Sequence, residues 1–510
     1  MKVFAAIDVG SYELAMKIYE VSAKGGLKII DHIRKRIELG TDTYNTGKIS
    51  HERVDELCNA LLEFKQILKG YNPDAVRVCG TSAIRETKNT YIVIEQIRLR
   101  TGFEVEVLSN SEQRFLHYKA IASKGERFEE LISKGAAIVD IGGGSIQVSL
   151  FDEGRLKTTQ NIRLGILRIR EILADLEAKT TDYTGLVSEL VDNHFYYFNE
   201  LYMEGRSVDN VIVVDDYISH ILQKAFGKDY VTTEELKNFY KEVKEGRLAD
   251  ISKRYGLSGE YASLLIPSTI LVRKLVKLAG AKGVWAPGVS LSDGMVYEYA
   301  SSEKLLRDRH NFEDDVVYCA HEVAKRYKSN EIRCALVERI ALKLFDETKK
   351  IHGLTKRHKL LLRIATILSD CGKYMSLEDA AECSYVIIMA TEMIGLSREE
   401  QEIVANVVKF NKAHFEYYEE IAKTSHLSRE GYLTMAKLTA IFRLADGICR
   451  SYKDKVKDIK VQIKEAELVI NVDSDESTIL ERGFFLRKAG HFEEAFSIKP
   501  VLVHKKKNRG

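Results

Sequence analysis

The sequence predicts an α/β protein made of two similar halves, followed by a helical domain and a small α+β part. A loop motif that follows an apolar strand occurs twice, at residues 8–11 and 140–145. Strand and helix patterns alternate through residues 1–302, whereas residues 303–453 show the apolar stripes of long packed helices. Strand patterns return only in residues 454–510. These changes of pattern predict four domains, 1–125, 126–302, 303–453 and 454–510.

The repeated loop is the strongest signal in the chain. In each copy an apolar strand ends in an aspartate, Asp8 or Asp140, and continues into a turn of glycine and serine. Alternating apolar residues then predict a second strand, a glycine turn and a third strand. Such turns are common, but two copies in the same strand context favour an internal duplication. The N–H groups of this turn can hold a phosphate and its carboxylate a hydrated metal ion, so two facing loops predict a phosphate clamp.

The other elements follow from apolar spacing and from glycine and proline stops. The first half is completed by helices over residues 50–69, 90–100 and from 111, and by strands over 75–79 and 103–108. The second half contains helices over 164–176 and 184–203, a strand over 208–214 and further helices up to residue 279. The C-terminal part is predicted as strands over 459–463, 468–472 and 501–504, with a helix over 477–487.

Composition is that of a soluble globular protein, with 45% hydrophobic and 30% charged residues among 510. A formal net charge of +2 indicates no general affinity for nucleic acid. No apolar run approaches the roughly 18 residues of a membrane span, and the N-terminus lacks a signal-peptide layout. We therefore expect a cytoplasmic protein without a membrane partner. Seven cysteines without C-x-x-C spacing argue against a disulfide framework or a zinc site.

A basic run occupies residues 348–369, which contain six lysines or arginines and no acidic residue. Such a run is most often a solvated helix surface, but it can also form a track for a linear polyanion. Lys356 and Arg357 lie centrally in the run, close to Gly353, and are the candidate polyanion contacts. The sequence leaves both interpretations open.

Five segments carry a resemblance to the exopolyphosphatase and guanosine pentaphosphate phosphatase family. They are D-V-G-S at 8–11, G-T-S-A-I-R at 80–85, S-N-S-E-Q at 109–113, D-I-G-G-G-S at 140–145 and L-G-I-L-R at 164–168. The resemblance implies two RNase-H-like halves of the actin and sugar-kinase type, followed by an all-α domain similar to HD phosphohydrolases and the small α+β C-terminal domain. It implies an enzyme that hydrolyses phosphoanhydride bonds of inorganic polyphosphate or guanosine pentaphosphate with Mg²⁺ or Mn²⁺ as cofactor. It also allows a homodimer.

The resemblance also implies a role for each matching residue. Arg85 stabilises charge on the phosphoryl group, and Glu112 and Gln113 stand where the family has a pair of glutamates, the second being the water-activating base. The groups that would bind phosphate oxygens are Ser11, Gly142, Gly143, Gly144 and Ser145. Those that would flank the metal ion are Asp8, Asp140 and Gln147.

Two glutamines stand where the resemblance leads us to expect acids. Gln113 replaces the base and Gln147 replaces a metal-placing carboxylate. A glutamine cannot accept a proton at neutral pH, and general-base catalysis is worth roughly 10²–10⁴-fold. An impaired hydrolase, with Glu112 as substitute base, is therefore one hypothesis. A non-catalytic regulatory protein that binds polyphosphate or an alarmone is the alternative, and a kinase of the same superfamily is a weaker third.

The helical domain has lost the residues of an HD metal site. Arg333, Ser369 and Glu382 stand where HD-type relatives place histidines, and only Asp370 and Asp446 remain. Two aspartates without imidazole partners do not make that metal site. The sequence predicts a scaffold or a polyanion-binding wall there.

Overall fold

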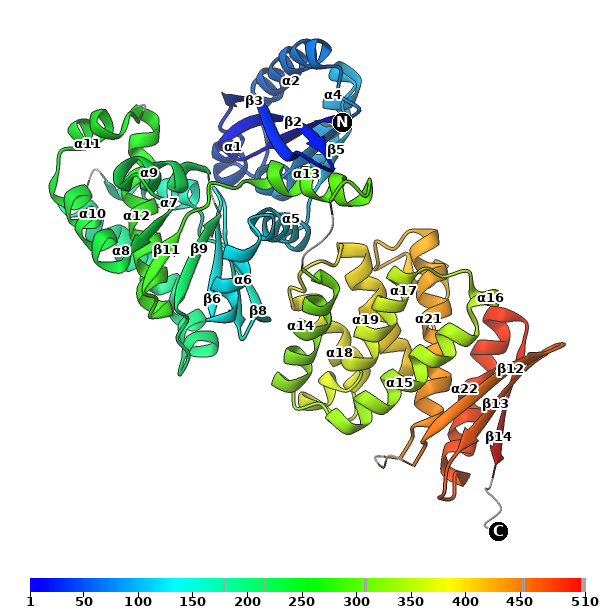
Figure 1. Ribbon diagram of the computed structural model, residues 1–510. Helices are drawn as coiled ribbons and strands as arrows, with labels where there is room; N and C mark the ends of the chain where they lie inside the picture. Colours follow the sequence, from blue (N-terminus) through cyan, green and yellow to red (C-terminus); the bar gives the residue numbers. More distant parts are fainter. Residues whose placement is uncertain are drawn as a thin grey trace. The chain divides into compact units, whose positions relative to one another are not determined.

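The computed structural model describes residues 1–177, 179–214, 216–257, 259–306, 310–451, 453 and 455–505 (Figure 1). The chain divides into two compact units, Met1–Asn311 and Phe312–Gly510. Among the described residues, no helix combines the length and the apolar character that crossing a membrane requires.

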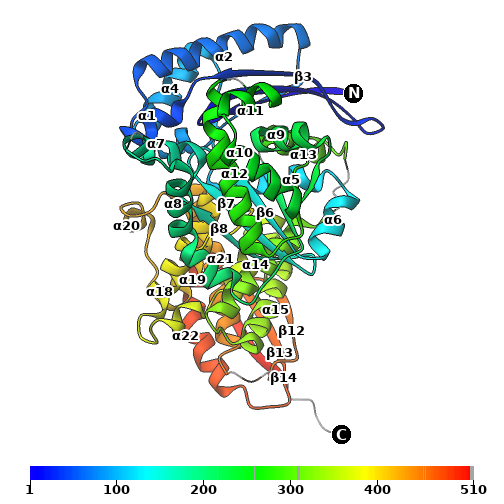
Figure 2. The ribbon, with the colours of Figure 1, turned by 90° about the vertical axis from the view of Figure 1, so that its left-hand side faces the viewer.

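The first half of unit 1 contains a five-stranded sheet with the order β3-β2-β1-β4-β5. The first three strands form an antiparallel meander, and β4 and β5 run parallel to β1. The β2–β3 hairpin projects beyond the rest of this sheet (Figure 2). The elements are β1 (Lys2–Val9), β2 (Glu13–Ser22), β3 (Gly26–Arg36), α1 (Leu39–Asn45), α2 (His51–Tyr71), β4 (Ala75–Gly80), α3 (Ser82–Glu86), α4 (Thr90–Thr101), β5 (Val105–Val107), α5 (Asn110–Ala122) and α6 (Glu126–Ser133).

The second half of unit 1 contains a six-stranded sheet with the order β10-β11-β9-β6-β7-β8. Helices α7, α8 and α12 pack against one another beside it. The elements are β6 (Ala136–Ile141), β7 (Ile146–Asp152), β8 (Arg155–Ile162), α7 (Ile166–Glu177), α8 (Tyr183–Phe198), the π-helix η1 (Asn199–Met203), β9 (Asn210–Val214), α9 (Asp216–Phe226), β10 (Tyr230–Thr232), α10 (Thr233–Glu245), α11 (Leu248–Tyr255), α12 (Gly259–Ala279), β11 (Gly283–Trp285) and α13 (Leu291–Ser302).

The predicted duplication is confirmed by the topology of the two sheets. The meander β1-β2-β3 corresponds to β6-β7-β8, and the parallel strands β4 and β9 lie at the same place beside β1 and β6. Even the irregularities match, because the register shifts once in each outer hairpin, at Ile18/Tyr19 and at Leu150/Phe151. Each half therefore presents its Asp-Gly loop at the same end of the same strand.

Helix α13 crosses back onto the first sheet, which the sequence did not predict. The boundary 126–302 groups this helix with the second half, but Leu291, Met295 and Val296 are buried in one core with Phe4 and Tyr19 of the first sheet (Figure 1). Close approach of α13 to α5 needs a glycine, because a Cβ on Gly294 would lie 2.1 Å from the Leu116 carbonyl oxygen. Helix α13 therefore links the two halves, because it follows the second half in the sequence and packs on the sheet of the first.

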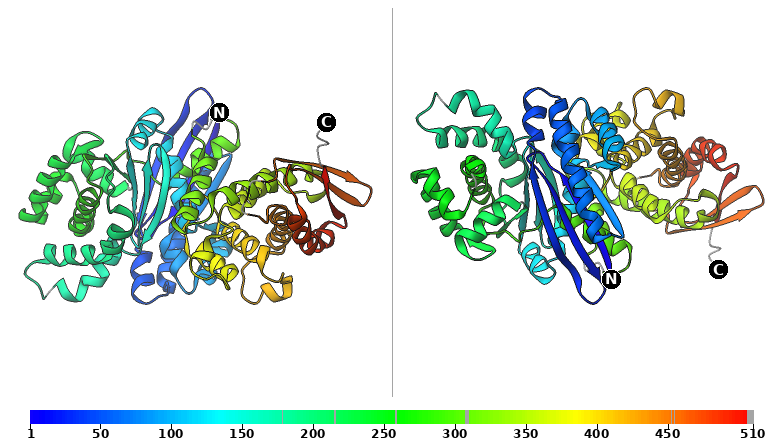
Figure 3. Two further views of the ribbon diagram at one scale, coloured as in Figure 1. Left: turned by 90° about the horizontal axis from the view of Figure 1, so that it is seen from below. Right: turned by 90° about the horizontal axis from the view of Figure 1, so that it is seen from above.

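Unit 2 is a helical bundle followed by a three-stranded sheet with the order β12-β13-β14. Helix α22 lies against one face of this sheet and also packs on α21 (Figure 3). One continuous hydrophobic core joins the bundle to the sheet. The elements are α14 (Phe312–Arg326), α15 (Glu331–Glu347), α16 (Lys349–His352), α17 (Lys356–Ile367), the 3₁₀ helix η2 (Cys371–Tyr374), α18 (Ala380–Ala390), α19 (Arg398–Lys412), α20 (Tyr418–Ile421), α21 (Arg429–Ile448), β12 (Asp458–Lys464), β13 (Glu467–Asp473), α22 (Ile479–Phe496) and β14 (Lys499–Lys505).

Most predicted elements occur within a few residues of their expected bounds. The exceptions are short or local: α1, α3 and α6 were not predicted, and the stretch expected to be only helical up to residue 279 contains the strand β10. Strand β10 has three residues at the edge of its sheet, too few for a two-residue alternation to be recognised. Helix α22 continues nine residues past the predicted end at 487, to Phe496.

Candidate functional site

A pocket of about 190 Å³ lies in unit 1 and is lined by residues of both halves. The first half contributes the end of β1, its loop and helix α5, and the second half contributes the end of β6, its loop and the start of α7. The lining includes Asp8, Gly10, Ser11, Gln113, His117, Asp140, Gly142 and Gly143. Most of the residues predicted for phosphate and metal binding therefore gather around one cavity.

The two loops have the same internal hydrogen bond. Gly10 N donates to the Glu13 carbonyl oxygen at 3.0 Å, and Gly142 N donates to the Ser145 carbonyl oxygen at 2.9 Å. Both bonds start two residues after the strand-end aspartate and close three residues later. In this register Ser11 corresponds to Gly143, which the sequence comparison of the two motifs did not align.

The loops also face each other across the pocket. An ideal Cβ placed on Gly143 would lie 3.1 Å from the Cβ of Ser11, closer than ordinary van der Waals contact, so the two loops approach each other closely at this point. Ser11 Oγ lies 2.8 Å from Tyr44 Oη and 2.7 Å from Ser82 Oγ. Tyr44 Oη also lies 3.0 Å from Ser82 Oγ, so the three hydroxyls share hydrogen bonds, and burial raises the pKa of Tyr44.

The peptides of the second loop are oriented by helix α7 and the residues before it. Ile166 N donates to the Gly142 carbonyl at 3.0 Å, Arg168 N to the Gly143 carbonyl at 3.0 Å, and Arg168 Nε to the Gly144 carbonyl at 2.8 Å. In a trans peptide the N–H points opposite to its C=O. The N–H groups of residues 143, 144 and 145 therefore point away from α7, as anion-binding nests require.

This arrangement needs a glycine before α7. A Cβ on Gly165 would lie 2.3 Å from the carbonyl carbon and oxygen of Gly143, so any side chain there would displace the loop. The other end of the Arg168 guanidinium donates to Glu86 at 2.6 Å, which ties this loop to helix α3 of the first half. The L-G-I-L-R segment is thus the support of the second loop.

Asp140 is held by two side chains of helix α5. Gln113 Nε2 donates to Asp140 Oδ2 at 3.3 Å, and His117 Nδ1 lies 2.8 Å from the same oxygen. Arg85 Nη1 donates to Gln113 Oε1 at 3.3 Å and to the Leu108 carbonyl at 2.7 Å. Arg85 thus contacts Gln113, and it is not among the described residues that line the pocket.

Glu112 serves the local structure of helix α5. Its carboxylate accepts a hydrogen bond from Ser109 N at 2.9 Å, and Ser109 Oγ accepts one from Glu112 N, which completes a capping box. The described lining of the pocket does not include Glu112. The structure therefore gives no support to Glu112 as a substitute base.

The side chains around Asp140 are weaker ligands for a divalent ion than the acids that the resemblance implies, because Gln113 and Gln147 are neutral. Gln147, its neighbour on β7, is neutral, and its buried Oε1 has no hydrogen-bond partner among the described residues. Asp140 already accepts from an amide and faces an imidazole. No group of three or more His, Cys, Asp or Glu residues that could hold a metal occurs in the described part of the chain. Asp8 remains as a carboxylate at the pocket.

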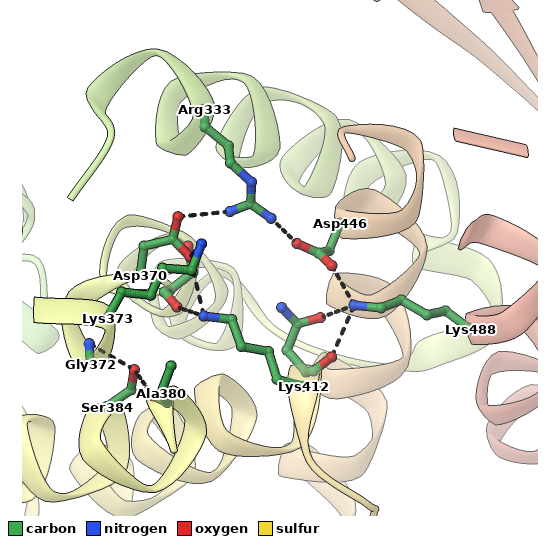
Figure 4. Close-up of polar contacts among 11 residues, drawn as sticks. Arg333, Asp370, Gly372, Lys373, Ala380, Ser384, Lys412, Asp446 and Lys488 are labelled. Atoms are coloured by element: carbon green, nitrogen blue, oxygen red, sulfur yellow. Dashed lines mark hydrogen bonds and ion pairs between the residues drawn. The ribbon is translucent and has the colours of Figure 1, made fainter. Parts of the chain in front are cut away.

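Of the five residues that the sequence comparison placed at HD positions, unit 2 joins Arg333, Asp370 and Asp446 in ion pairs (Figure 4). Glu382 instead pairs with Lys409. Arg333 donates to Asp370 at 3.2 Å and also to Asp446, which is ion-paired to Lys488 on its other oxygen. Lys412 and Lys373 lie 3.2 and 3.0 Å from the second oxygen of Asp370. Four cations thus surround two buried carboxylates.

Electrostatics keep both carboxylates ionised. Burial alone would raise the pKa of Asp370, but the charges of Arg333, Lys412 and Lys373 hold the pKa below its usual value. Lys488 and Arg333 do the same for Asp446, against a larger cost of burial, and hold its pKa well below the usual range. Both buried carboxylates are thus neutralised by cations of the chain itself.

Three of the six cations of the basic run, Arg357, Lys359 and Arg363, are ion-paired within unit 2, and Lys349 and Lys350 are exposed. Arg357 makes a bidentate ion pair with Glu400, at 2.6 and 2.7 Å, and also donates to the Gly395 carbonyl. Lys359 and Arg363 pair with Asp346 and Glu338, whereas Lys356 is exposed. This pairing favours the solvated-surface interpretation over the polyanion track, because Arg357 is committed to a fixed partner.

Two residues of the site were not recognised in the sequence. His117 follows Gln113 by four positions, which places both on one face of a helix, so the helical spacing was a usable signal. Tyr44 lies in α1, a helix that was not predicted, and no local pattern connects it with Ser11.

Comparison with known proteins agrees with this architecture. A sequence model of the Ppx/GppA phosphatase family matches residues 17–302, and one of Ppx/GppA phosphatase domain III matches residues 318–484. The guanosine-5'-triphosphate,3'-diphosphate pyrophosphatase of Photobacterium profundum is 20% identical over 476 residues, which cover 92% of this chain and 91% of that protein.

Two crystal structures share the fold of this chain. An exopolyphosphatase-like protein is 19% identical with a TM-score of 0.52, and the alignment covers 59% of this chain and 99% of that one. The exopolyphosphatase from Cytophaga hutchinsonii is 16% identical with a TM-score of 0.50, over 60% of this chain and all of that one. At these identities the likeness concerns the fold alone.

Proposed function

The chain belongs to the Ppx/GppA phosphatase family, whose members are hydrolases, and we propose that it releases the terminal phosphate of guanosine pentaphosphate or inorganic polyphosphate. The observation that carries the proposal is the contact between the duplicated loops, where Ser11 meets Gly143 at one pocket. The name of the curated relatives, guanosine-5'-triphosphate,3'-diphosphate pyrophosphatase, makes guanosine pentaphosphate the first substrate to test.

In this proposal the chain's own groups bind the terminal phosphate from both sides. The N–H groups of residues 143–145 donate to its oxygens on one side, and Ser11 Oγ donates from the other, while Tyr44 and Ser82 orient the serine. Asp8, which lines the pocket, would hold a Mg²⁺ or Mn²⁺ ion bound with the phosphate chain, and such an ion would neutralise phosphate charge. Arg85 acts indirectly by holding the amide of Gln113.

The alternative is a protein that binds these ligands without hydrolysing them. The glutamines at 113 and 147 favour it, because both replace acids that the family uses. A cytoplasmic location and a homodimer stay predictions.

Phosphate release from guanosine pentaphosphate and from polyphosphate of defined length, with Mg²⁺ or Mn²⁺, tests the proposal directly, with binding measured under the same conditions. We expect release, and we expect Ser11→Ala to lower kcat/KM by roughly 10–100-fold, the value of one charge-assisted hydrogen bond. Ser149→Ala, at a buried serine of β7 away from the pocket lining, is the matched control. Binding without release would support the regulatory alternative, and neither binding nor release would refute both.

A further inference from the structure

The cleft of unit 1 lacks an acid at the position where the family carries its base. Gln113 cannot accept a proton, and the carboxylate of Glu112 is used in the cap of α5. Hydrolysis nevertheless needs a group that takes a proton from the attacking water. The proton acceptors among the described residues that line this pocket are the carboxylates of Asp8, Glu13 and Asp140 and the imidazole of His117.

His117 meets this requirement. It lies one helical turn beyond Gln113 on α5, it is 7% exposed, and it lines the pocket together with Ser11 and Gly143. Its Nδ1 lies 2.8 Å from Oδ2 of Asp140, which is itself 6% exposed. In the tautomer that donates Nδ1–H to this carboxylate, the lone pair is on Nε2. A carboxylate also orients the ring and stabilises the imidazolium that forms when Nε2 takes a proton.

The surroundings of Asp140 favour this role over metal binding. The Gln113 amide donates to Asp140 and its own oxygen is held by Arg85, so the amide fixes the carboxylate that faces the imidazole. A glutamate at 113 would instead place two carboxylates about 3 Å apart, an arrangement that requires a shared proton or a cation. Gln113 and His117 are therefore matched substitutions on one face of one helix.

We propose that His117 is the water-activating base of this enzyme, with Asp140 and Gln113 as positioning residues. The proposal rests on the hydrolase function proposed above. The oxygen of a water molecule forms a bond to the terminal phosphorus while the bond from that phosphorus to the bridging oxygen breaks. One water proton passes to Nε2 of His117, the shortened chain leaves with the electron pair on its new terminal oxygen, and the imidazolium returns its proton to solvent. The products are inorganic phosphate and the shortened chain.

Two substitutions at this position separate catalysis from support. His117→Asn places an amide nitrogen near the Nδ1 position and can keep the bond to Asp140, but it has no basic nitrogen. His117→Ala leaves room for an added imidazole. The matched control is His310→Ala, because His310 also pairs with a carboxylate, Glu129 at 2.9 Å, and bonds to Tyr118 at 2.7 Å, outside the described pocket lining.

We expect both His117 variants to lose about 10²–10⁴-fold in kcat, with polyphosphate affinity within threefold of wild type. Added imidazole should raise the kcat of His117→Ala at least tenfold. It should leave the kcat of His117→Asn and of His310→Ala unchanged. If the kcat of His117→Asn were within threefold of wild type, His117 would only position Asp140 and the proposal would be wrong. A His117→Ala variant whose activity imidazole does not restore would also overturn the proposal. A wild-type chain that binds but releases no phosphate would instead refute the proposed function itself, before any variant is compared.

Discussion

Unit 1 and unit 2 each hold two aspartates where the family resemblance implies a metal, but the partners of these aspartates differ. In unit 1, the side chains that contact Asp140 within the described part of the chain are an amide and an imidazole, and Asp140 lines an open pocket. In unit 2, Asp370 and Asp446 are ion-paired to arginine and lysine and are buried. The first environment leaves groups directed at a ligand, whereas the second satisfies the carboxylates internally.

The comparison shows two ways in which the chain's own side chains accommodate a buried aspartate. Cations, as around Arg333, neutralise the carboxylates within a buried ion-pair network. An amide and an imidazole, as at Gln113 and His117, keep the carboxylate active in orienting a neighbour. Only the second solution retains proton chemistry.

The largest effect should come from removing the central cation of unit 2. Arg333→Met leaves Asp370 and Asp446 with lost partners in a buried site, which typically costs about 3–5 kcal/mol. The control is Lys359→Met, because the partly exposed pair of Lys359 with Asp346 should contribute only about 0–1 kcal/mol. Chemical denaturation of the full chain measures both. Equal losses of unfolding free energy in the two variants would contradict a stabilising role for the buried ion pairs of Arg333.

A smaller effect should appear as acid sensitivity of unit 2. The folded-state pKa values of Asp370 and Asp446 are lowered, against about 3.9 in the unfolded chain. A lowered folded pKa stabilises the folded state fully above about pH 4, and this contribution is lost as the pH falls through the folded value. We expect the denaturant concentration at the unfolding midpoint to decrease when the pH is lowered below 4. This decrease should be smaller in Asp446→Asn. A midpoint that falls equally in both proteins would show that other groups cause the sensitivity.

In unit 1, Gln113→Glu should increase the affinity of the pocket for a divalent metal ion. The new carboxylate would lie beside Asp140, so the two charges would repel each other unless a cation or proton intervened. We expect Mg²⁺ to raise the melting temperature of this variant by more than that of wild type. Thermal unfolding with and without Mg²⁺ is the measurement, and Gln113→Met, which adds no charge, is the control. A variant with no Mg²⁺ response would contradict this interpretation of position 113.

The smallest effect should follow changes in the basic run. Lys356 is exposed and Arg357 is paired with Glu400, so Lys356→Ala should change the salt dependence of polyphosphate binding very little. Arg357→Ala should lower stability by about 1 kcal/mol or less without changing affinity. Binding of long polyphosphate at several salt concentrations checks this. A clearly flatter salt slope in Lys356→Ala would restore the polyanion track that the ion pairs argue against.

The sequence was sufficient for features that depend on local pattern. The strand, loop and hairpin around Asp8 and Asp140 repeat the same periodicity, so their duplication and the loops could be predicted. Contacts made by residues far apart could not be derived, such as Leu291 on Phe4, His117 beside Asp140, or Tyr44 beside Ser11. The pairing of Arg333 with Asp370 and Asp446 likewise depends on how three segments pack, although the loss of histidines there was visible.

The central claim is that phosphate chemistry belongs to the loops of unit 1 and that the aspartates of unit 2 have only a structural role. Phosphate release by Gly143→Ala and by Asp446→Asn, compared at a temperature where both remain folded, tests it directly. A Cβ on Gly143 would press against Ser11 and Leu167, at 3.1 and 3.0 Å, so we predict that this variant releases phosphate at least tenfold more slowly than wild type. Asp446→Asn should release it at the wild-type rate. A folded Asp446→Asn variant without activity, or a Gly143→Ala variant with full activity, would contradict the account.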